Sequence, residues 1–134
     1  MIDHENEIFG IIYDAVMDFR KDVYVTSEKA NAPASFPCVY VEQTDSYNPR
    51  QYEQISSYKE TVAKVVTTVE VYSNKPSGKR QEAKSIFAVI DTAMRRNGFR
   101  RTTQNYLDLT DINNNAINKA VIRLLARYER LYVE

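Results

Sequence analysis

The residues best suited to acid–base, nucleophilic or metal chemistry are few in this chain. His4 is its only histidine and Cys38 its only cysteine. A histidine that acts as a base or metal ligand needs partners, so we interpret His4 as a solvated end residue. A cysteine nucleophile would have to use His4, so we interpret Cys38 as a small apolar filler. One cysteine also excludes an internal disulfide and a cysteine-based metal site.

Several carboxylates remain as candidates for a metal-dependent nuclease. Asp108 and Asp111 flank a predicted turn, and with Asp45 or Glu42 they could gather around a divalent ion. Aspartates that cap turns explain the same residues without a metal, and we favour this interpretation. We therefore expect no enzyme, no metal and no cofactor.

Four arginines form the one marked basic cluster, on both sides of Gly98: Arg95, Arg96, Arg100 and Arg101. The dipole of the preceding predicted helix favours cations at its end, which accounts for the first two. The alternative is an electrostatic contact with an acidic surface of a neighbouring subunit, or with DNA phosphates inside a ring. Such a patch would set orientation and not sequence specificity.

A second candidate contact surface is the polar segment "DSYNPRQYEQISSY", from 45 to 58, which we expect to be a loop or the flexible tip of a hairpin. Tyrosine gives a large contact area at low entropic cost and is enriched in interface cores. The residues predicted to contact a partner are Tyr47, Arg50, Tyr52 and Tyr58. The alternative is that these rings fold back on their own sheet.

Length and composition indicate a single folded domain, 1–134. The hydrophobic share is 43%, and no apolar run reaches the roughly 18 residues that a membrane span needs. Lys plus Arg and Asp plus Glu number 18 each, which removes the general attraction of a basic protein for nucleic acid or anionic membranes. The acidic start "MIDHENEIFG" does not resemble a signal peptide, so we expect a cytoplasmic protein.

Hydrophobic periodicity predicts two helices and several strands. Spacings of three and four predict a helix over 3–21 and another after "NKPSGK", with Ser77 or a neighbour as its cap and Gly98 as its left-handed stop. Strands are predicted at 22–27, 38–44, 59–73 and 99–111. The 59–73 strand would reach roughly 45 Å, so part of it should project beyond the domain. Its inward-facing set is Ala63, Val65, Thr67, Val69 and Val71.

The closing stretch "AVIRLLARYERLYVE" fits two backbone shapes. As a helix, it keeps apolar spacings of four and three, and Ala, Leu, Arg and Glu favour that state. As a strand, it has an unbroken apolar face that includes Ala120, Leu124 and Tyr128. Local pattern alone leans slightly to helix.

The stretch "VEVYSNKPSGKRQEAKSIFAVIDTAMRRNGFRRT", with "IRLLARYERLYV" after it, resembles tail terminator, or tail-completion, proteins of long-tailed phages and prophages of Gram-positive bacteria. In that family a strand leads through a Gly-containing turn into a helix, a "GFxRT" turn and a closing "ARY" strand. The resemblance covers the chain from Phe36 to Val133. The "INNNAINK" insert and the Tyr-rich segment depart from the family pattern, so their contacts cannot be transferred.

The resemblance implies an α+β fold with a mixed or antiparallel sheet of about five strands and two main helices on one face, in the order α-β-β-β-α-β-β. It makes Lys119 to Val133 a strand, against the local lean, and this strand would pair with Phe99 to Thr110, which otherwise leaves an unpaired edge.

It also implies a structural virion protein without catalysis, located at the tail–head junction after assembly in the host cytoplasm. The partners implied are other copies in a hexameric ring, the tail tube protein, the head–tail connector and DNA in the ring lumen. A head-side connector or neck component and a metal-dependent nuclease or nucleic-acid-binding protein stay as alternatives.

Overall fold

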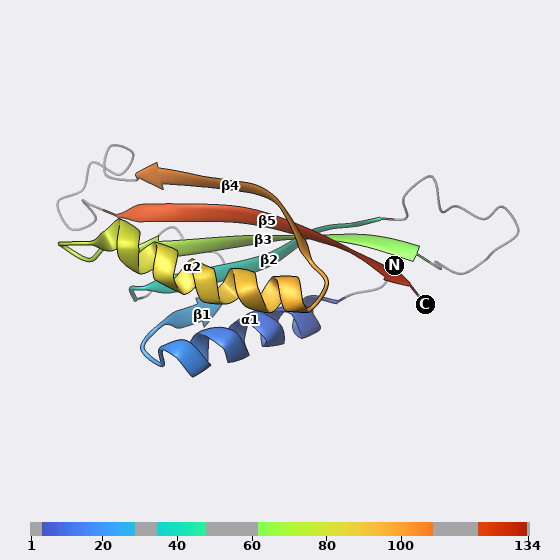
Figure 1. Cartoon of the computed structure of the whole chain (residues 1–134), viewed down its shortest axis with the longest axis horizontal. Helices are drawn as coiled ribbons and strands as arrows, with labels where there is room; N and C mark the ends of the chain where they lie inside the picture. Colours follow the sequence, from blue (N-terminus) through green and yellow to red (C-terminus); the bar gives the residue numbers. More distant parts are fainter. Residues whose placement is uncertain (1–3, 29–34, 48–61, 109–120, 134) are drawn as a thin grey trace, which may run out of the picture.

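The computed structural model describes residues 4–28, 35–47, 62–108 and 121–133, which form an α+β fold (Figure 1). The predicted order α-β-β-β-α-β-β is confirmed. The elements are α1 (Glu5–Phe19), β1 (Tyr24–Thr26), β2 (Cys38–Tyr47), β3 (Val62–Ser73), α2 (Lys79–Arg96), β4 (Arg100–Asp108) and β5 (Ile122–Val133).

The five strands form one mixed sheet in the order β1-β2-β3-β5-β4. β1 pairs with β2 in parallel, and the other neighbours are antiparallel. The closing stretch is therefore a strand, because β5 lies between β3 and β4 and pairs with both. Burial on one face and pairing on both edges outweigh the helical propensity of its residues.

Both helices pack on the same face of the sheet (Figure 1). Alternate side chains of each strand point to that face, and there they meet the apolar stripes of the helices. The predicted inward set of β3 is confirmed, since all five side chains are fully buried. Each buried Val, Ile, Leu or Phe contributes about 1.5–3 kcal/mol to stability. The helix residues in this core are Ile8, Ile12, Val16, Ala83, Ile86, Phe87, Ile90 and Met94.

The central strands extend past the helices. β2 continues to Tyr47 through a register shift between Gln43 and Asp45, so the prediction that 45–47 belong to a loop is wrong. The backbone of this segment finds partners on β3, where Tyr47 lies opposite Lys64. Figure 1 shows the ends of β3 and β5 projecting beyond both helices, as the length of the 59–73 segment predicted.

Two glycines set the ends of α2. Gly98 has a φ of 85° and follows the helix as its predicted left-handed stop, where the Phe99 amide donates to the Met94 carbonyl at 3.0 Å. At the start, the N-cap residue is Gly78, with a φ of 81°. The prediction of Ser77 or a neighbour as the cap is therefore confirmed for the neighbour, although no side chain forms a capping hydrogen bond. Among the described residues, no helix is long and apolar enough to cross a membrane.

Candidate functional site

The sheet face opposite the helices carries most of the polar side chains of the central strands. We call it the helix-free face, because both described helices pack on the other side. Strand alternation and register assign to it the following residues: Cys38, Tyr40 and Glu42 of β2; Lys64, Val66, Thr68, Glu70 and Tyr72 of β3; and Arg123, Leu125, Arg127, Glu129 and Leu131 of β5.

A buried carboxylate lies at the centre of this face. Glu70 is 2% exposed, and its Oε1 accepts hydrogen bonds from Arg123 Nη1 at 2.9 Å and from Tyr72 Oη at 3.2 Å. On the neighbouring strand, Tyr40 Oη donates to Glu42 Oε2 at 2.7 Å. The Arg123–Glu70 bond joins β5 to β3, whereas the two tyrosine bonds lie within one strand. A buried charge such as that of Glu70 requires such partners.

The acidic groups beside Glu70 keep their protons at neutral pH. Burial, together with the charge of Glu70, raises the pKa of the Cys38 thiol to about 11. Burial and the bond to Glu70 raise the pKa of Tyr72 to about 12, and burial with the Glu42 bond raises that of Tyr40. The thiol is thus the poorly nucleophilic form, which fits the interpretation of Cys38 as a filler.

The strand register separates the carboxylates considered for a metal site. Asp108 lies opposite Ile122, which pairs with Ser73, whereas Glu42 lies opposite Thr68. Thr68 and Ser73 are five positions apart on β3, which is about 17 Å.

Asp45 lies opposite Val66, which is farther still from Ser73 along β3. The hypothesis that Asp108 gathers with Glu42 or Asp45 around one ion is therefore wrong, and Asp111 lies outside the described residues. No cluster of three or more His, Cys, Asp or Glu side chains in the described ranges could hold a metal.

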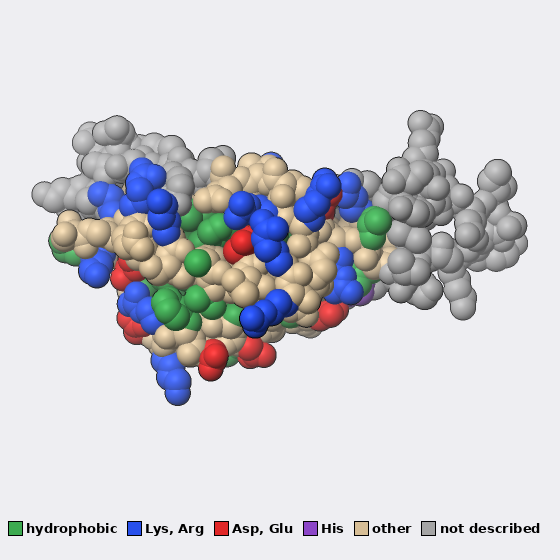
Figure 2. Space-filling model, in the orientation of Figure 1, with side chains coloured by type: hydrophobic (Ala, Val, Ile, Leu, Met, Phe, Trp, Pro, Cys, Tyr) green, Lys and Arg blue, Asp and Glu red, His purple; other side chains and the backbone are tan. Residues whose placement is uncertain are grey.

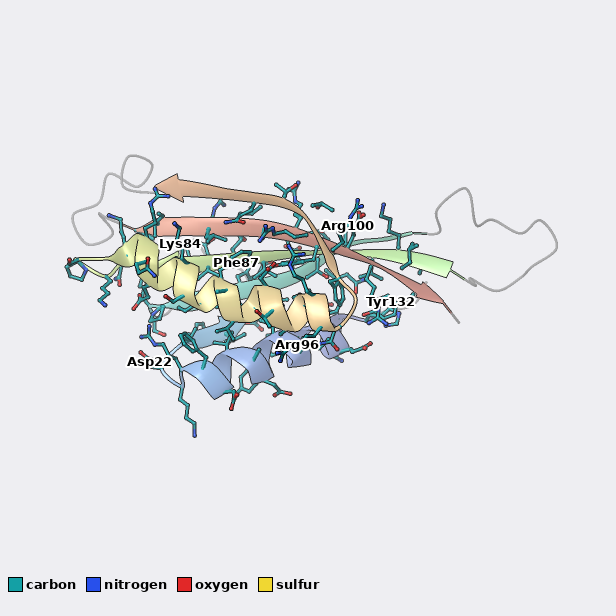
Figure 3. All side chains as sticks on the ribbon, viewed as in Figure 1. Asp22, Lys84, Phe87, Arg96, Arg100 and Tyr132 are labelled. Carbon is teal, nitrogen blue, oxygen red and sulfur yellow. The ribbon has the colours of Figure 1, made fainter. Side chains whose placement is uncertain are left out.

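The four arginines do not form one patch. Arg95 and Arg101 both contact Asp91 on the helix side, with N–O distances of 2.8 and 3.4 Å. Arg100 contacts Glu129 at 3.1 Å on the opposite side of the sheet. The prediction of a single cluster is wrong because successive strand residues point to opposite faces. Arg96, labelled with Arg100 in Figure 3, is exposed and forms no ion pair within the described chain.

Asp91 joins α2 to two strands. It accepts a 2.7 Å hydrogen bond from the fully buried Tyr128 of β5, besides its contacts with Arg95 and with Arg101 of β4. Burial alone would raise the pKa of Asp91, but the Tyr128 bond and the two arginines outweigh it and lower that pKa. Arg101 also lies over the Phe87 ring, 5.7 Å from its centroid. Sequence reasoning missed this cluster, because its members come from separate elements and meet only in the folded chain.

His4 is not a solvated end residue, which corrects the prediction. Its ring stacks on Tyr132 at a centroid distance of 3.6 Å, and its side chain is 17% exposed. Its backbone amide donates to Gln43 Oε1 at 3.3 Å, and its Nδ1 lies 3.3 Å from Glu7. His4 therefore helps to fix the start of α1 on the projecting end of β5.

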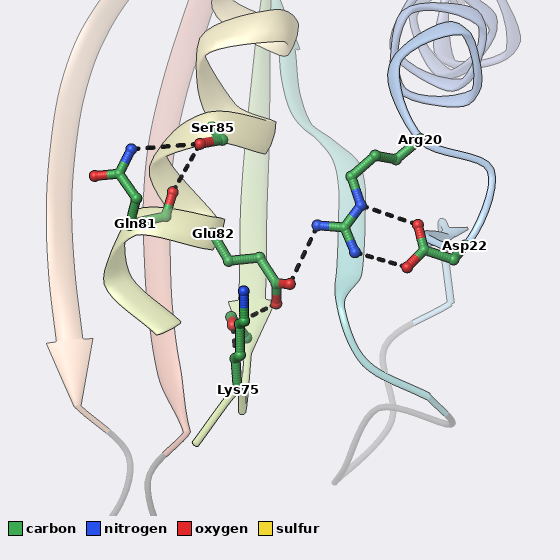
Figure 4. Close-up of polar contacts among 7 residues, drawn as sticks. Arg20, Asp22, Lys75, Gln81, Glu82 and Ser85 are labelled. Carbon is green, nitrogen blue, oxygen red and sulfur yellow. Dashed lines mark hydrogen bonds and ion pairs between the residues drawn. The ribbon is translucent and has the colours of Figure 1, made fainter. Parts of the chain in front are cut away.

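Ion pairs also connect the end of α1 to the start of α2 (Figure 4). The Arg20 guanidinium contacts Asp22 at 2.6 Å and Glu82 at 3.1 Å, and these two hydrogen bonds raise its pKa although burial opposes them. Glu82 also accepts a 2.7 Å bond from Ser73 at the end of β3. The two helices are thus tied to each other and to the sheet at this end.

The Tyr-rich contact surface is only partly within the described structure. Tyr47 belongs to the last position of β2, while Arg50, Tyr52 and Tyr58 lie outside the described residues. A docking role for these four residues stays a prediction.

Two strand edges remain without partners among the described residues. β1 pairs only with β2, and β4 pairs only with β5, so each end of the sheet presents a row of backbone donors and acceptors. Large apolar side chains are also exposed, with Tyr24 of β1 and Leu131 of β5 both at 41%. Unpaired edges are templates for strand addition by another chain or another copy.

No protein-family profile matches this chain, and no curated protein is significantly similar to it in sequence.

Proposed function

We propose that this protein is a structural virion component of the tail terminator type, which assembles into a homo-oligomeric ring on the phage tail tube and joins it to the head connector. The ring is hexameric by the resemblance. No step of this function is catalytic, and no cofactor takes part.

The observation that carries the proposal is the place of β5. The "ARY" segment of the resemblance, Ala126 to Tyr128, forms the middle of a strand between β3 and β4. The "VYSNK" segment ends β3 and leads through Gly78 into α2, and the "GFRRT" segment leads from α2 into β4. The sequence features that suggested the family thus fall on the elements that the family would place there.

The fold also supplies surfaces of the kind a ring needs. A closed ring of identical copies uses two different surfaces on each protomer, one at each lateral end. Here the sheet ends laterally in β1 on one side and β4 on the other, and both helices cover one face only. The projecting ends of β2, β3 and β5 give a further surface, directed away from the helices, that could meet an axial partner.

The mass of the purified chain in solution, measured by light scattering after gel filtration, tests the ring. We expect a species several times 15.5 kDa, seen as rings in negative-stain images. Some ring proteins assemble only on their tube, so the same chain is also mixed with purified tail tubes. A chain that stays monomeric alone and with tubes would overturn the proposal.

The same images separate the tail-side from the head-side assignment. Mixed in turn with tail tubes and with DNA-filled heads, the protein should bind the tube end and bind heads only through the connector. Rings that bind heads but do not bind tail tubes would indicate a connector or neck component instead.

A further inference from the structure

The two helices carry opposite charges on their exposed surfaces. Every charged side chain of α1 is acidic, and all of them are exposed: Glu5, Glu7, Asp14 and Asp18. The exposed charged side chains of α2 are all basic: Arg80, Lys84, Arg95 and Arg96. Both acids of α2 are half-buried. Glu82 contacts Arg20, and Asp91 contacts Tyr128, Arg101 and, of the exposed bases, Arg95. Figure 2 shows acidic side chains along the margin where α1 lies and basic ones over α2 and β4.

These charges follow two lines on opposite margins of the helix layer. Asp14 and Asp18 stand seven and eleven positions after Glu7, so the three share one line of α1. Figure 2 shows the acidic side chains on the side of α1 that faces away from α2.

The basic line lies on the other side of α2. Lys84 and Arg80 stand seven and eleven positions before Asp91 and therefore share its line. Asp91 contacts Arg101 of β4 and Tyr128 of β5, so this line faces the β4 end of the sheet. Lys84 is labelled on this part of α2 in Figure 3.

The two lines are also level with each other along the helix axes. Arg20, just after α1, contacts Glu82 in the first turn of α2 at 3.1 Å, so the end of α1 lies beside the start of α2. Asp14 and Asp18 occupy the second half of α1, and Arg80 and Lys84 occupy the first turns of α2. A second copy placed beside the first, in the same orientation, would bring these acids and bases together.

The placement of these charges is unfavourable within the single chain. The helix dipole disfavours an anion in a last turn and a cation in a first turn. Yet Asp18 is in the last turn of α1, and Lys79 and Arg80 are in the first turn of α2. Asp14, Asp18 and Lys84 form no ion pair with any described residue, so no described ion pair offsets the cost at Asp18.

We propose that the acidic line of α1 in one copy binds the basic line of α2 in the next copy, through Asp14 and Asp18 on one side and Arg80 and Lys84 on the other. The inference rests on the proposed function, since it gives the ring its lateral contact. The contact is head-to-tail, and its charge pattern sets direction and register. The exposed Tyr13 and Phe19 of α1, at 44% and 45%, add apolar area beside it.

Two charge-reversed variants test the contact: D14K/D18K on α1 and R80E/K84E on α2. D14K/D18K places cations towards the end of α1, and R80E/K84E places anions towards the start of α2. The helix dipole favours both changes, so both variants should fold. Circular dichroism and the melting temperature check this. T92E is the matched control, because Thr92 is exposed on α2 outside the basic line.

Each variant alone brings like charges together at every contact, so we expect its assembly to need at least about tenfold more protein than the wild type or T92E. A 1:1 mixture restores opposite charges at each contact between unlike copies, so it should assemble with the two variants alternating. The proposed contact would be overturned if either variant alone assembled like the wild type, or if the mixture of two folded variants did not assemble. Either result would leave the proposal of a ring unaffected. A wild-type chain that stays monomeric even with tubes would overturn both proposals.

Discussion

At the scale of single residues, the pair between Glu70 and Arg123 offers the sharpest test of the helix-free face. Replacing Arg123 by Met leaves a carboxylate that is 2% exposed without its guanidinium partner. The side chain of Arg123 is itself 23% exposed, so we expect a loss of about 2–3 kcal/mol, below the cost for a fully buried pair. The measurement is the free energy of unfolding in urea.

Arg127 provides the matched control for this substitution. It lies on the same strand and the same face, but it is exposed, and its side chain forms no ion pair within the described residues. R127M should change the unfolding free energy by less than about 0.5 kcal/mol. Equal effects of the two substitutions would show that Glu70 does not depend on Arg123.

The Cys38 thiol should react slowly while the chain is folded. Its pKa is raised from 9.0 to about 11 by burial and by the charge of Glu70. Thiolate is the reactive form, so at pH 8 alkylation by iodoacetamide should be about 100-fold slower than in the urea-unfolded chain. The folded-state rate should keep rising until about pH 11, whereas that of the unfolded chain levels off near 9.

The raised pKa of Cys38 also makes the free energy of unfolding depend on pH. Folding favours the protonated thiol, so this contribution is fully present below about pH 9 and is lost as the pH rises towards about 11. Rapid alkylation of the folded chain at pH 8 would contradict both expectations.

At the scale of elements, the sequence predicted the helices and most strands because their apolar spacing is regular. The stripe of Ile8, Ile12 and Val16 and the alternation of β3 both survive in the core. The closing stretch was ambiguous because its apolar residues suit both periods, and only pairing with β3 and β4 makes it a strand. The extension of β2 to Tyr47 was missed because it passes through a register shift.

The polar clusters were beyond sequence reasoning for a different reason. Asp91 and Tyr128 are 37 positions apart, and Glu70 and Arg123 are 53 apart. Their contacts depend on strand order and register, which no local pattern fixes. The prediction of one arginine cluster near Gly98 failed for a related reason. Arg100 and Arg101 are neighbours in sequence but lie on opposite sides of the sheet.

Two glycines should respond to alanine in opposite directions. Gly98 has a φ of 85°, which strains any residue with a Cβ, so G98A should lower the unfolding free energy by about 1–2 kcal/mol. Gly10 lies inside α1, and a Cβ there meets nothing within 4 Å, so G10A should raise it by about 0.5–1 kcal/mol. Urea unfolding of both variants checks this, and a stabilising G98A would show that the left-handed stop is not required.

At the scale of the whole molecule, the fold separates surfaces by direction. The helix layer carries acids on one margin and bases on the other, while the sheet ends in β1 and β4. Backbone edges alone would permit several modes of strand addition. A lateral contact that also has to match charge has one direction and one register, which is what closure into a ring of fixed size requires.

Salt should therefore weaken assembly without affecting the fold. Between about 50 and 500 mM NaCl the Debye length falls from roughly 14 to 4 Å, so attraction between exposed charges is screened. We expect the protein concentration at half-assembly to rise about tenfold over this range, while the melting temperature of the dissociated chain changes little. Light scattering at several concentrations measures the first quantity. Assembly that is equally strong at both salt concentrations would assign the lateral contact to strand edges and apolar area, because neither depends on Coulomb attraction.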